Sequence, residues 1–192
     1  MNTSRITSKE GYICFLKMDK IALGITRKRP KLLGDEIWKF QRLLRKIEYY
    51  NNCKSGIAKI HMLFLKCKFH NLGIRLGFSI PINVFGAGLS IAHRGTIVVN
   101  PLAKIGKNCR LHTCVNIGTQ AGASSEVPTI GNNVYIGPGA KIFGNIKIAD
   151  NIAIGANAVV NKSFDIPNIT IGGVPAKIIS QKGTESIICT NE

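Results

Sequence analysis

Residues 129–160 read TIGNNVYIGPGAKIFGNIKIADNIAIGANAVV, and an aliphatic residue recurs at every sixth position of this stretch. The recurring residues are Ile130, Ile136, Ile142, Ile148, Ile154 and Val160. An amphipathic helix would repeat about every 3.6 residues and a two-faced strand every two. The period of six therefore predicts a different unit, in which a short strand and a tight turn repeat together.

The same phase continues upstream, and a second apolar position follows four residues after most members. The upstream members are Val99, Ile105, Leu111 and Ile117, with Ala103, Cys109 and Val115 at the second position. Three units of six close one triangular coil, with the aliphatic residue inward and Gly or Asn in the turns. The sequence predicts a mainly β protein, a left-handed parallel β-helix of the hexapeptide type preceded by an α-helical segment. Strands of a sandwich would not hold this phase through six members.

A coil of 18 residues allows positions in neighbouring coils to be matched, once insertions are counted. Two extra residues are expected within IVV, after Ile97, and seven are expected to leave the coil as a loop within GTQAGASSEVPT, residues 118–129. One corner should then stack the following residues, with the loop overhanging the groove beside them: His93, Thr113, Pro138 and Ala156.

Two histidines, His93 and His112, fall at this predicted corner, where side chains point outward. A histidine titrates near neutral pH and can serve as a general base beside a groove. Exposed filler and metal binding are the alternatives. Zinc normally takes three protein ligands, and no third His or Cys falls on that edge, so no metal is expected.

The N-terminal part is basic and predicted to be helical. The chain has 192 residues and a net charge of +16, and 17 of its 26 Lys and Arg residues lie in residues 1–80. Residues 1–30 show no clear pattern. A helix is predicted from Asp35 as N-cap, with an apolar stripe of Ile37, Phe40, Leu44 and Ile47. Its basic residues are expected mostly away from that stripe: Lys39, Arg42, Arg45 and Lys46. A second amphipathic segment, SGIAKIHMLFLKCKFHNLG, is expected to end at Gly73.

The expected organisation is a helical region at 1–76, a β-helix domain at 77–180 and a tail at 181–192. The basic residues could form a solvated helix face, or contact an anionic membrane surface or an acidic substrate. The helices could instead pack against the rest of the protein or a sister subunit. Nucleic acid is not expected, because no zinc-finger, RRM or KH signature is present. No apolar run approaches the roughly 18 residues of a membrane span, and no secretory signal is visible, so a cytoplasmic location is expected. The six cysteines form no CxxC pair and should be reduced thiols.

Four stretches together resemble the serine acetyltransferase-like branch of the hexapeptide acyltransferases. They are IAHRGTIVVNPLAKIGKNC (91–109), TIGNNVYIGPGAKIFG (129–144), IGANAVV (154–160) and GGVPAKII (172–179). The resemblance covers about residues 78–180, and the branch includes O-acetyltransferases of bacterial surface polysaccharides. It implies a homotrimer with acetyl-CoA bound between subunits; assembly of the trimers into a dimer of trimers is left open.

The resemblance also implies roles for single residues. His93 matches the family's base, which takes the proton from the acceptor hydroxyl and returns it to the CoA thiolate. The pantetheine arm would lie near Gly137, Pro138, Ala156 and Asn161, and the phosphate end near Lys177. His112 is a second catalytic candidate, and Thr113 and Glu126 are candidates for acceptor binding.

Three departures from the family concern the acceptor. Ala92 stands where serine acetyltransferases have an Asp before the base, Val127 replaces their second histidine, and GFSIPINVFG (77–86) holds no match for an upstream Asp. Glu126 or His112 could replace the missing groups. The departures favour a sugar hydroxyl of a surface polysaccharide or its precursor as the acceptor, with L-serine as the alternative. A metal-dependent carbonic anhydrase and a non-catalytic binding module are the remaining alternatives.

Overall fold

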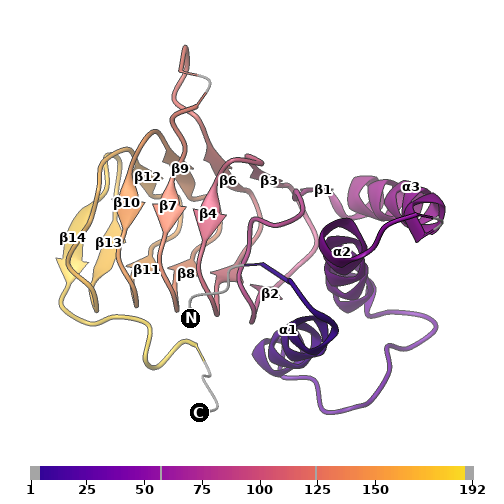
Figure 1. Cartoon of the computed structure of the whole chain (residues 1–192). Helices are drawn as coiled ribbons and strands as arrows, with labels where there is room; N and C mark the ends of the chain where they lie inside the picture. The colour runs from indigo at the N-terminus through magenta and orange to yellow at the C-terminus, as the bar shows by residue number, and fades with distance from the viewer. Residues whose placement is uncertain (1–4, 57, 124, 189–192) are drawn as a thin grey trace.

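Three helices at one end of a three-sided parallel β-helix make up the structure (Figure 1). The computed structural model describes residues 5–56, 58–123 and 125–188. The helices are α1 (Lys9–Ala22), α2 (Glu36–Cys53) and α3 (Ala58–Leu76). None of the helices in the described ranges is long and apolar enough to cross a membrane.

Each side of the β-helix is one sheet, and successive coils add strands to it in parallel. The first side contains β1 (Phe78–Ser79), β3 (Ile97–Val99), β6 (Val115–Gly118), β9 (Lys141–Phe143) and β12 (Val159–Val160). The second side contains β4 (Lys104–Ile105), β7 (Thr129–Ile130) and β10 (Lys147–Ile148). The third side contains β2 (Ser90–Ile91), β5 (Arg110–Leu111), β8 (Tyr135–Ile136), β11 (Ala153–Ile154), β13 (Thr170–Gly172) and β14 (Lys177–Ser180). Only β14 among these strands pairs antiparallel, and it ends the third side.

The core of the β-helix is the six-residue repeat, as the sequence predicts. All six aliphatic residues of the 129–160 stretch are at most 2 % exposed. The four upstream members are at most 3 % exposed. Cys109 points inward, and burial raises the pKa of its thiol, so it is a packing residue.

The stacking order counted from the sequence is confirmed, but one insertion lies elsewhere. Ile91 pairs with Leu111, Leu111 with Ile136, and Ile136 with Ile154. Ile97 pairs with Val115, so the two extra residues lie before Ile97, in the turn 92–96, and not within IVV. The six-residue repeat predicts the number of inserted residues correctly. It places them wrongly because every residue of IVV is an aliphatic strand former.

The corner between the second and third sides is held by a ladder of asparagines. Asn108, Asn133, Asn151 and Asn168 have φ values of 55°, 54°, 60° and 61°, a left-handed conformation that Asn tolerates better than most residues. Each side-chain amide donates to the carbonyl oxygen of the next Asn at 2.8 Å. The repeat therefore requires Asn here for both its backbone and its side chain.

The helical region differs from the sequence expectation in three places. The pattern of residues 1–30 did not predict α1, which Ser8 caps through its hydroxyl. Helix α3 continues past Gly73 to Leu76, and Gly77 follows at φ 78°. Asp35 precedes α2 as expected but makes no capping bond to it, since its carboxylate accepts from the Lys31 N–H and from Arg27.

Arg45, expected on the polar face of α2, is instead fully buried and joins the helices to the β-helix. Its guanidinium donates to Asp19 of α1 at 2.8 Å, to Glu48 at 3.0 Å and to the carbonyl oxygen of Gly86 at 2.7 Å. Burial alone would lower the pKa of Arg45, but the two carboxylates raise it. Asp19 also accepts from the backbone N–H groups of Gly88 and Leu89 at 2.9 Å. The network fixes the docking of α1 and α2 on the first coil.

Candidate active site

The corner between the third and first sides carries both histidines that the sequence singles out. Thr113, Pro138 and Ala156 each follow a third-side strand by two residues and stack there in one column. His93 follows β2 by two residues, in the widened turn of the coil next to Thr113. Backbone hydrogen bonds carry the ladder into the corner, from the Ala92 N–H to Leu111 O at 2.9 Å and from the His112 N–H to Ile136 O at 3.1 Å. The column is therefore set by strand register.

The two imidazoles face each other across neighbouring coils. The ring centroids of His93 and His112 are 5.9 Å apart and tilted by 58°. His93 is exposed, whereas His112 is half-buried against the edge of Tyr135, with ring centroids 5.2 Å apart. His93 is thus free to accept a proton from a bound molecule, and His112 is the nearest ring to it.

His112 lies in a positively charged setting. Its pKa is lowered first by burial and then by the charges of Arg110 and His93. Arg110, at the outward position of β5, donates to the Ser90 hydroxyl at 3.1 Å. It pairs in register with Tyr135, so both side chains stand beside His112 on the third side. A lowered pKa leaves His112 neutral at pH 7, and a neutral ring does not repel a proton arriving at His93.

The sequence reasoning missed Arg110 and Tyr135 as members of this site. That reasoning considered only the inward positions of the repeat and the residues at the corners. Arg110 and Tyr135 each point outward, one position before an inward aliphatic residue. The signal was present, because the register that aligns Leu111 with Ile136 also aligns Arg110 with Tyr135.

His93 stands on a turn that is wider than the turns above it. The turn contains the two inserted residues, and Gly95 adopts φ 139° within it. A Cβ atom at Gly95 would lie 3.1 Å from Cγ2 of Thr113, so the turn rests closely on the next coil. Only glycine fits this combination of backbone angle and contact.

The residues expected along the coenzyme arm divide between two edges. Gly137, Pro138 and Ala156 lie at the histidine corner, on the two coils that follow Thr113. Lys177 pairs with Gly172 at the top of the third side, and its side chain is exposed at the end of the same edge. Asn161 follows β12, so it lies across the first side, at the next corner.

Glu126 is not brought to the histidine corner within one chain. The loop that contains it leaves the coil between β6 and β7, at the corner of the first and second sides, and projects from the β-helix (Figure 1). The expected overhang above His93 is therefore wrong for a single subunit, because one full side separates the loop from the histidines.

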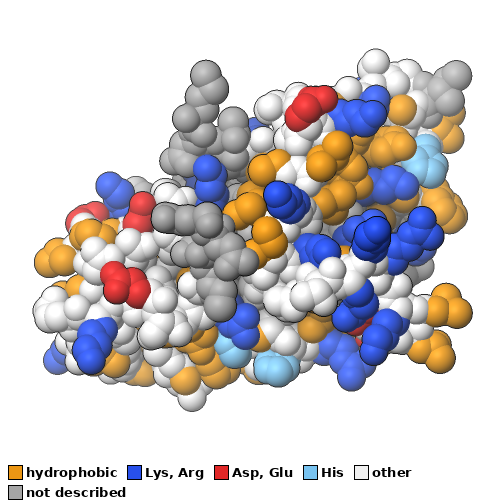
Figure 2. Space-filling view, turned by 90° about the horizontal axis from the view of Figure 1, so that it is seen from below, with side chains coloured by type: hydrophobic (Ala, Val, Ile, Leu, Met, Phe, Trp, Pro, Cys, Tyr) orange, Lys and Arg blue, Asp and Glu red, His pale blue; other side chains and the backbone are white. Residues whose placement is uncertain are grey.

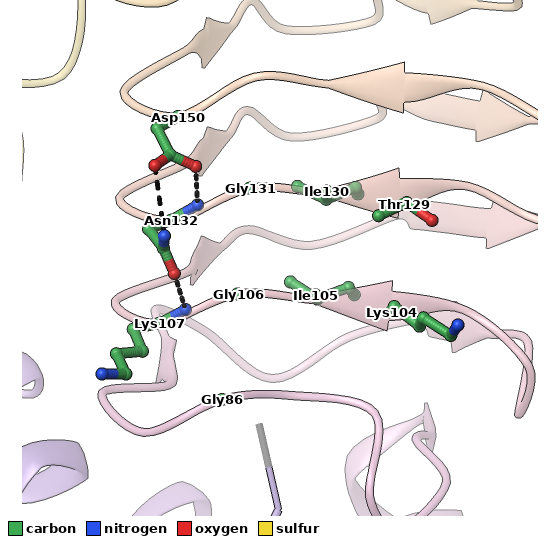
Figure 3. Close-up of a pocket in the computed structure, with 10 residues that line it drawn as sticks. All are labelled: Gly86, Lys104, Ile105, Gly106, Lys107, Thr129, Ile130, Gly131, Asn132 and Asp150. Atoms are coloured by element: carbon green, nitrogen blue, oxygen red, sulfur yellow. Dashed lines mark hydrogen bonds between the residues drawn. The ribbon is translucent and has the colours of Figure 1, made fainter. Parts of the chain in front are cut away.

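Metal-ligating side chains and a hollow on the second side are the other features that could mark a site. Among the residues that the structure describes, no three His, Cys, Asp or Glu side chains are grouped to hold a metal ion. A hollow of about 300 Å³ lies on the second side (Figure 3). Asn132 and Asp150 are engaged within the fold, since Asp150 accepts from the Asn132 N–H at 2.7 Å and Asn132 accepts from the Lys107 N–H at 2.9 Å. The hollow is therefore the surface of stacked turns of the β-helix.

Comparison with protein families and sequences gives one consistent kind of match. Residues 128–162 match the family model "Bacterial transferase hexapeptide (six repeats)". Serine acetyltransferase from Synechococcus elongatus is 37% identical over 100 residues, which are 51% of this chain and 40% of the relative. The Mycobacterium tuberculosis enzyme of the same name is 37% identical over 102 residues, 53% of this chain and 44% of the relative. The chain thus spans less than half the length of these relatives.

Comparison with solved structures gives the same kind of match over more of the chain. Serine acetyltransferase from Brucella abortus superposes with a TM-score of 0.68 and 25% identity, covering 91% of this chain and 71% of that one. A complex of that enzyme with coenzyme A superposes with a TM-score of 0.66, covering 91% and 70%. The similarity includes the helical region as well as the β-helix.

Proposed function

We propose that this chain, a serine acetyltransferase-like hexapeptide-repeat protein, is an acetyl-CoA-dependent O-acetyltransferase. The observation that carries the proposal is the placement of His93 and His112, with ring centroids 5.9 Å apart, on the same edge as Pro138 and Ala156. Histidine is the side chain that most often serves as the base for deprotonating a hydroxyl. The complex of the Brucella enzyme with coenzyme A supports the choice of donor.

In the proposed reaction His93 accepts the proton of the acceptor hydroxyl as the oxygen attacks the thioester carbonyl. The carbon–oxygen bond forms, the carbon–sulfur bond breaks, and the proton passes from His93 to the departing CoA thiolate. The products are the acetyl ester and free CoA thiol, and no covalent enzyme intermediate is formed. Ala92 cannot orient the imidazole as a carboxylate would, so His112 is proposed as the positioning residue for His93.

L-Serine is the acceptor that the relatives favour. The relatives and structures described above are all named serine acetyltransferases. The expectation of a sugar hydroxyl gains no support from these names. A sugar hydroxyl remains the second candidate because free serine is a zwitterion and needs charged or polar partners. Ala92 and Val127 stand where two such partners are expected, and Glu126 lies at another corner.

An acceptor screen tests this proposal. The purified protein is incubated with acetyl-CoA and either L-serine or a panel of bacterial sugars, and free CoA thiol is measured. Turnover with L-serine well above the rate without acceptor supports the serine reading. Turnover with a sugar and none with serine supports the second candidate. Absence of CoA binding would refute both and favour a binding module.

A homotrimer with acetyl-CoA between subunits is proposed as the working assembly. Apolar side chains are exposed near the histidine edge, including Val98 on the first side at 38% and Ile178 of β14 at 43%. A neighbouring subunit would cover such residues and could bring its own Glu126 loop to this edge. A dimer of trimers and a cytoplasmic location remain expectations.

A further inference from the structure

Helix α3 has two apolar faces, and only one of them is used by the fold. Leu65, Gly73 and Leu76 are buried, and Phe69 and Leu72 pack against the core. The opposite face carries four apolar residues with large exposed fractions: Ile60 at 73%, Leu63 at 64%, Phe64 at 66% and Ile74 at 67%. Leu63, Phe64 and Ile74 lie three, four and fourteen residues after Ile60, which places all four on one side of a helix. Such an exposed apolar stripe marks an interaction surface.

The segment before α2 extends this surface. Leu32 is 93% exposed and Leu33 86% exposed. Both line a groove of about 990 Å³ that also includes Phe64. Lys39 donates to the carbonyl oxygen of Leu32 at 2.7 Å, which holds the segment beside α2. We call Leu32, Leu33 and the four exposed apolar residues of α3 the outer apolar surface.

Positive charge surrounds the outer apolar surface. Lys59 and Lys66 lie on one flank of α3, and Lys68 and Arg75 lie on the other, all exposed. The groove is further lined by Lys39, Arg42 and Lys46, with Glu36 as its one acidic residue. Figure 2 shows Lys and Arg side chains gathered among apolar ones over the helical end of the molecule. An apolar stripe between two rows of cations is the pattern of a helix that lies in a membrane interface.

We propose that the outer apolar surface binds the surface of a bilayer that contains anionic phospholipid. The aliphatic and aromatic side chains enter the boundary between headgroups and acyl chains, and the flanking cations contact the phosphates. A second copy of the same surface fits poorly, because the two faces would bring their lysines and arginines together with few carboxylates to offset them. Nucleic acid would leave the leucines and Phe64 without apolar partners.

Vesicle flotation with the full-length protein tests the proposal. Vesicles of phosphatidylcholine with about one third phosphatidylglycerol are compared with pure phosphatidylcholine, at low and high salt. We expect binding to the anionic vesicles that weakens in high salt, and little binding to the neutral ones. Equal binding to both, or binding to neither at low salt, would overturn the proposal. The measurement needs neither acetyl-CoA nor acceptor, so its outcome is independent of the proposed activity.

Variants assign the binding to this surface. Leu33→Asp with Phe64→Asp should weaken binding by about 10-fold or more, and Lys68→Glu with Arg75→Glu by about 20-fold or more. Their controls are Ile166→Asp, at a residue 59% exposed at the far end of the β-helix, and Lys147→Glu with Lys182→Glu. If the control substitutions weaken binding as much as the test substitutions, the assignment of membrane binding to the outer apolar surface is wrong. A lower particle mass of the Leu33 and Phe64 variant in light scattering, without a loss of vesicle binding, would identify a contact between copies instead.

Discussion

At the scale of single residues, the candidate site depends on how His112 is kept neutral. Burial, Arg110 and His93 all lower the pKa of His112 below its usual 6.5. As the pH falls through this range, the unfolded chain takes up the proton before the folded one. The contribution of His112 to stability is therefore complete above about pH 6.5 and is lost at lower pH.

The variant Arg110→Gln should raise the pKa of His112, because it removes a positive charge next to the ring while leaving a polar side chain that can reach Ser90. Burial is the larger cause, so the pKa should return only part of the way to its usual value. An NMR titration of the His112 ring protons measures the change, with Lys147→Gln on the second side as the control. An unchanged pKa in Arg110→Gln would show that the charge of Arg110 does not reach the ring.

A second residue-scale prediction concerns the asparagine ladder. Asn133→Ala loses the hydrogen bonds to Asn108 and Asn151 and puts alanine at φ 54°. The free energy of unfolding should fall by about 2–3 kcal/mol. Asn133→Gly loses the same bonds without the backbone strain, so its loss should be smaller by about 1 kcal/mol. Denaturant unfolding compares the two, and equal losses would show that the backbone angle contributes nothing.

Which residues could be read from the sequence follows from where the repeat places them. The column of Thr113, Pro138 and Ala156 could be predicted because a fixed coil length determines which residues of neighbouring coils lie side by side. Arg110 and Tyr135 were missed because the six-residue repeat identifies inward positions only, and both residues point outward. Arg45 was expected at the surface because its partners, in α1 and the first coil, are distant in the sequence. A buried cation cannot be distinguished from a surface one until its carboxylates are located.

At the scale of elements, the docking of the helices depends on the Arg45 network. Arg45→Met would leave the carboxylates of Asp19 and Glu48 buried without their cation. We expect the free energy of unfolding to fall by about 3–5 kcal/mol. Lys46→Met is the matched control on the same helix and should cost less than about 1 kcal/mol, since the ammonium group of this half-buried residue lies 5.9 Å from the centre of the Tyr50 ring. Similar losses in thermal unfolding of the two variants would contradict this role of the network.

Element boundaries were predictable where the repeat is regular and not elsewhere. The six-residue phase locates the strands of the upper coils, and burial confirms their inward positions. Helix α1 escaped prediction because its buried residues, Phe15 and Asp19, do not form an apolar stripe. The number of inserted residues near His93 was predicted correctly, but their position was not, because all three residues of β3 are aliphatic and the inward ones cannot be told from the outward one.

At the scale of the whole molecule, the proposed trimer is open to direct measurement. Light scattering should give three times the chain mass of 20.9 kDa at micromolar concentration. The physical reason is the exposed apolar residues near the histidine edge, which an isolated chain would leave in water. A mass of one chain would contradict a site built between subunits.

The central claim is that the coil geometry makes His93 the base of an acetyl transfer. The most direct test is the release of CoA thiol by His93→Ala, with the acceptor that the wild-type protein turns over fastest and with His70→Ala, on the exposed face of α3, as control. We predict that kcat falls by about 10²-fold or more in His93→Ala and is unchanged in His70→Ala. Wild-type turnover by His93→Ala would contradict the claim.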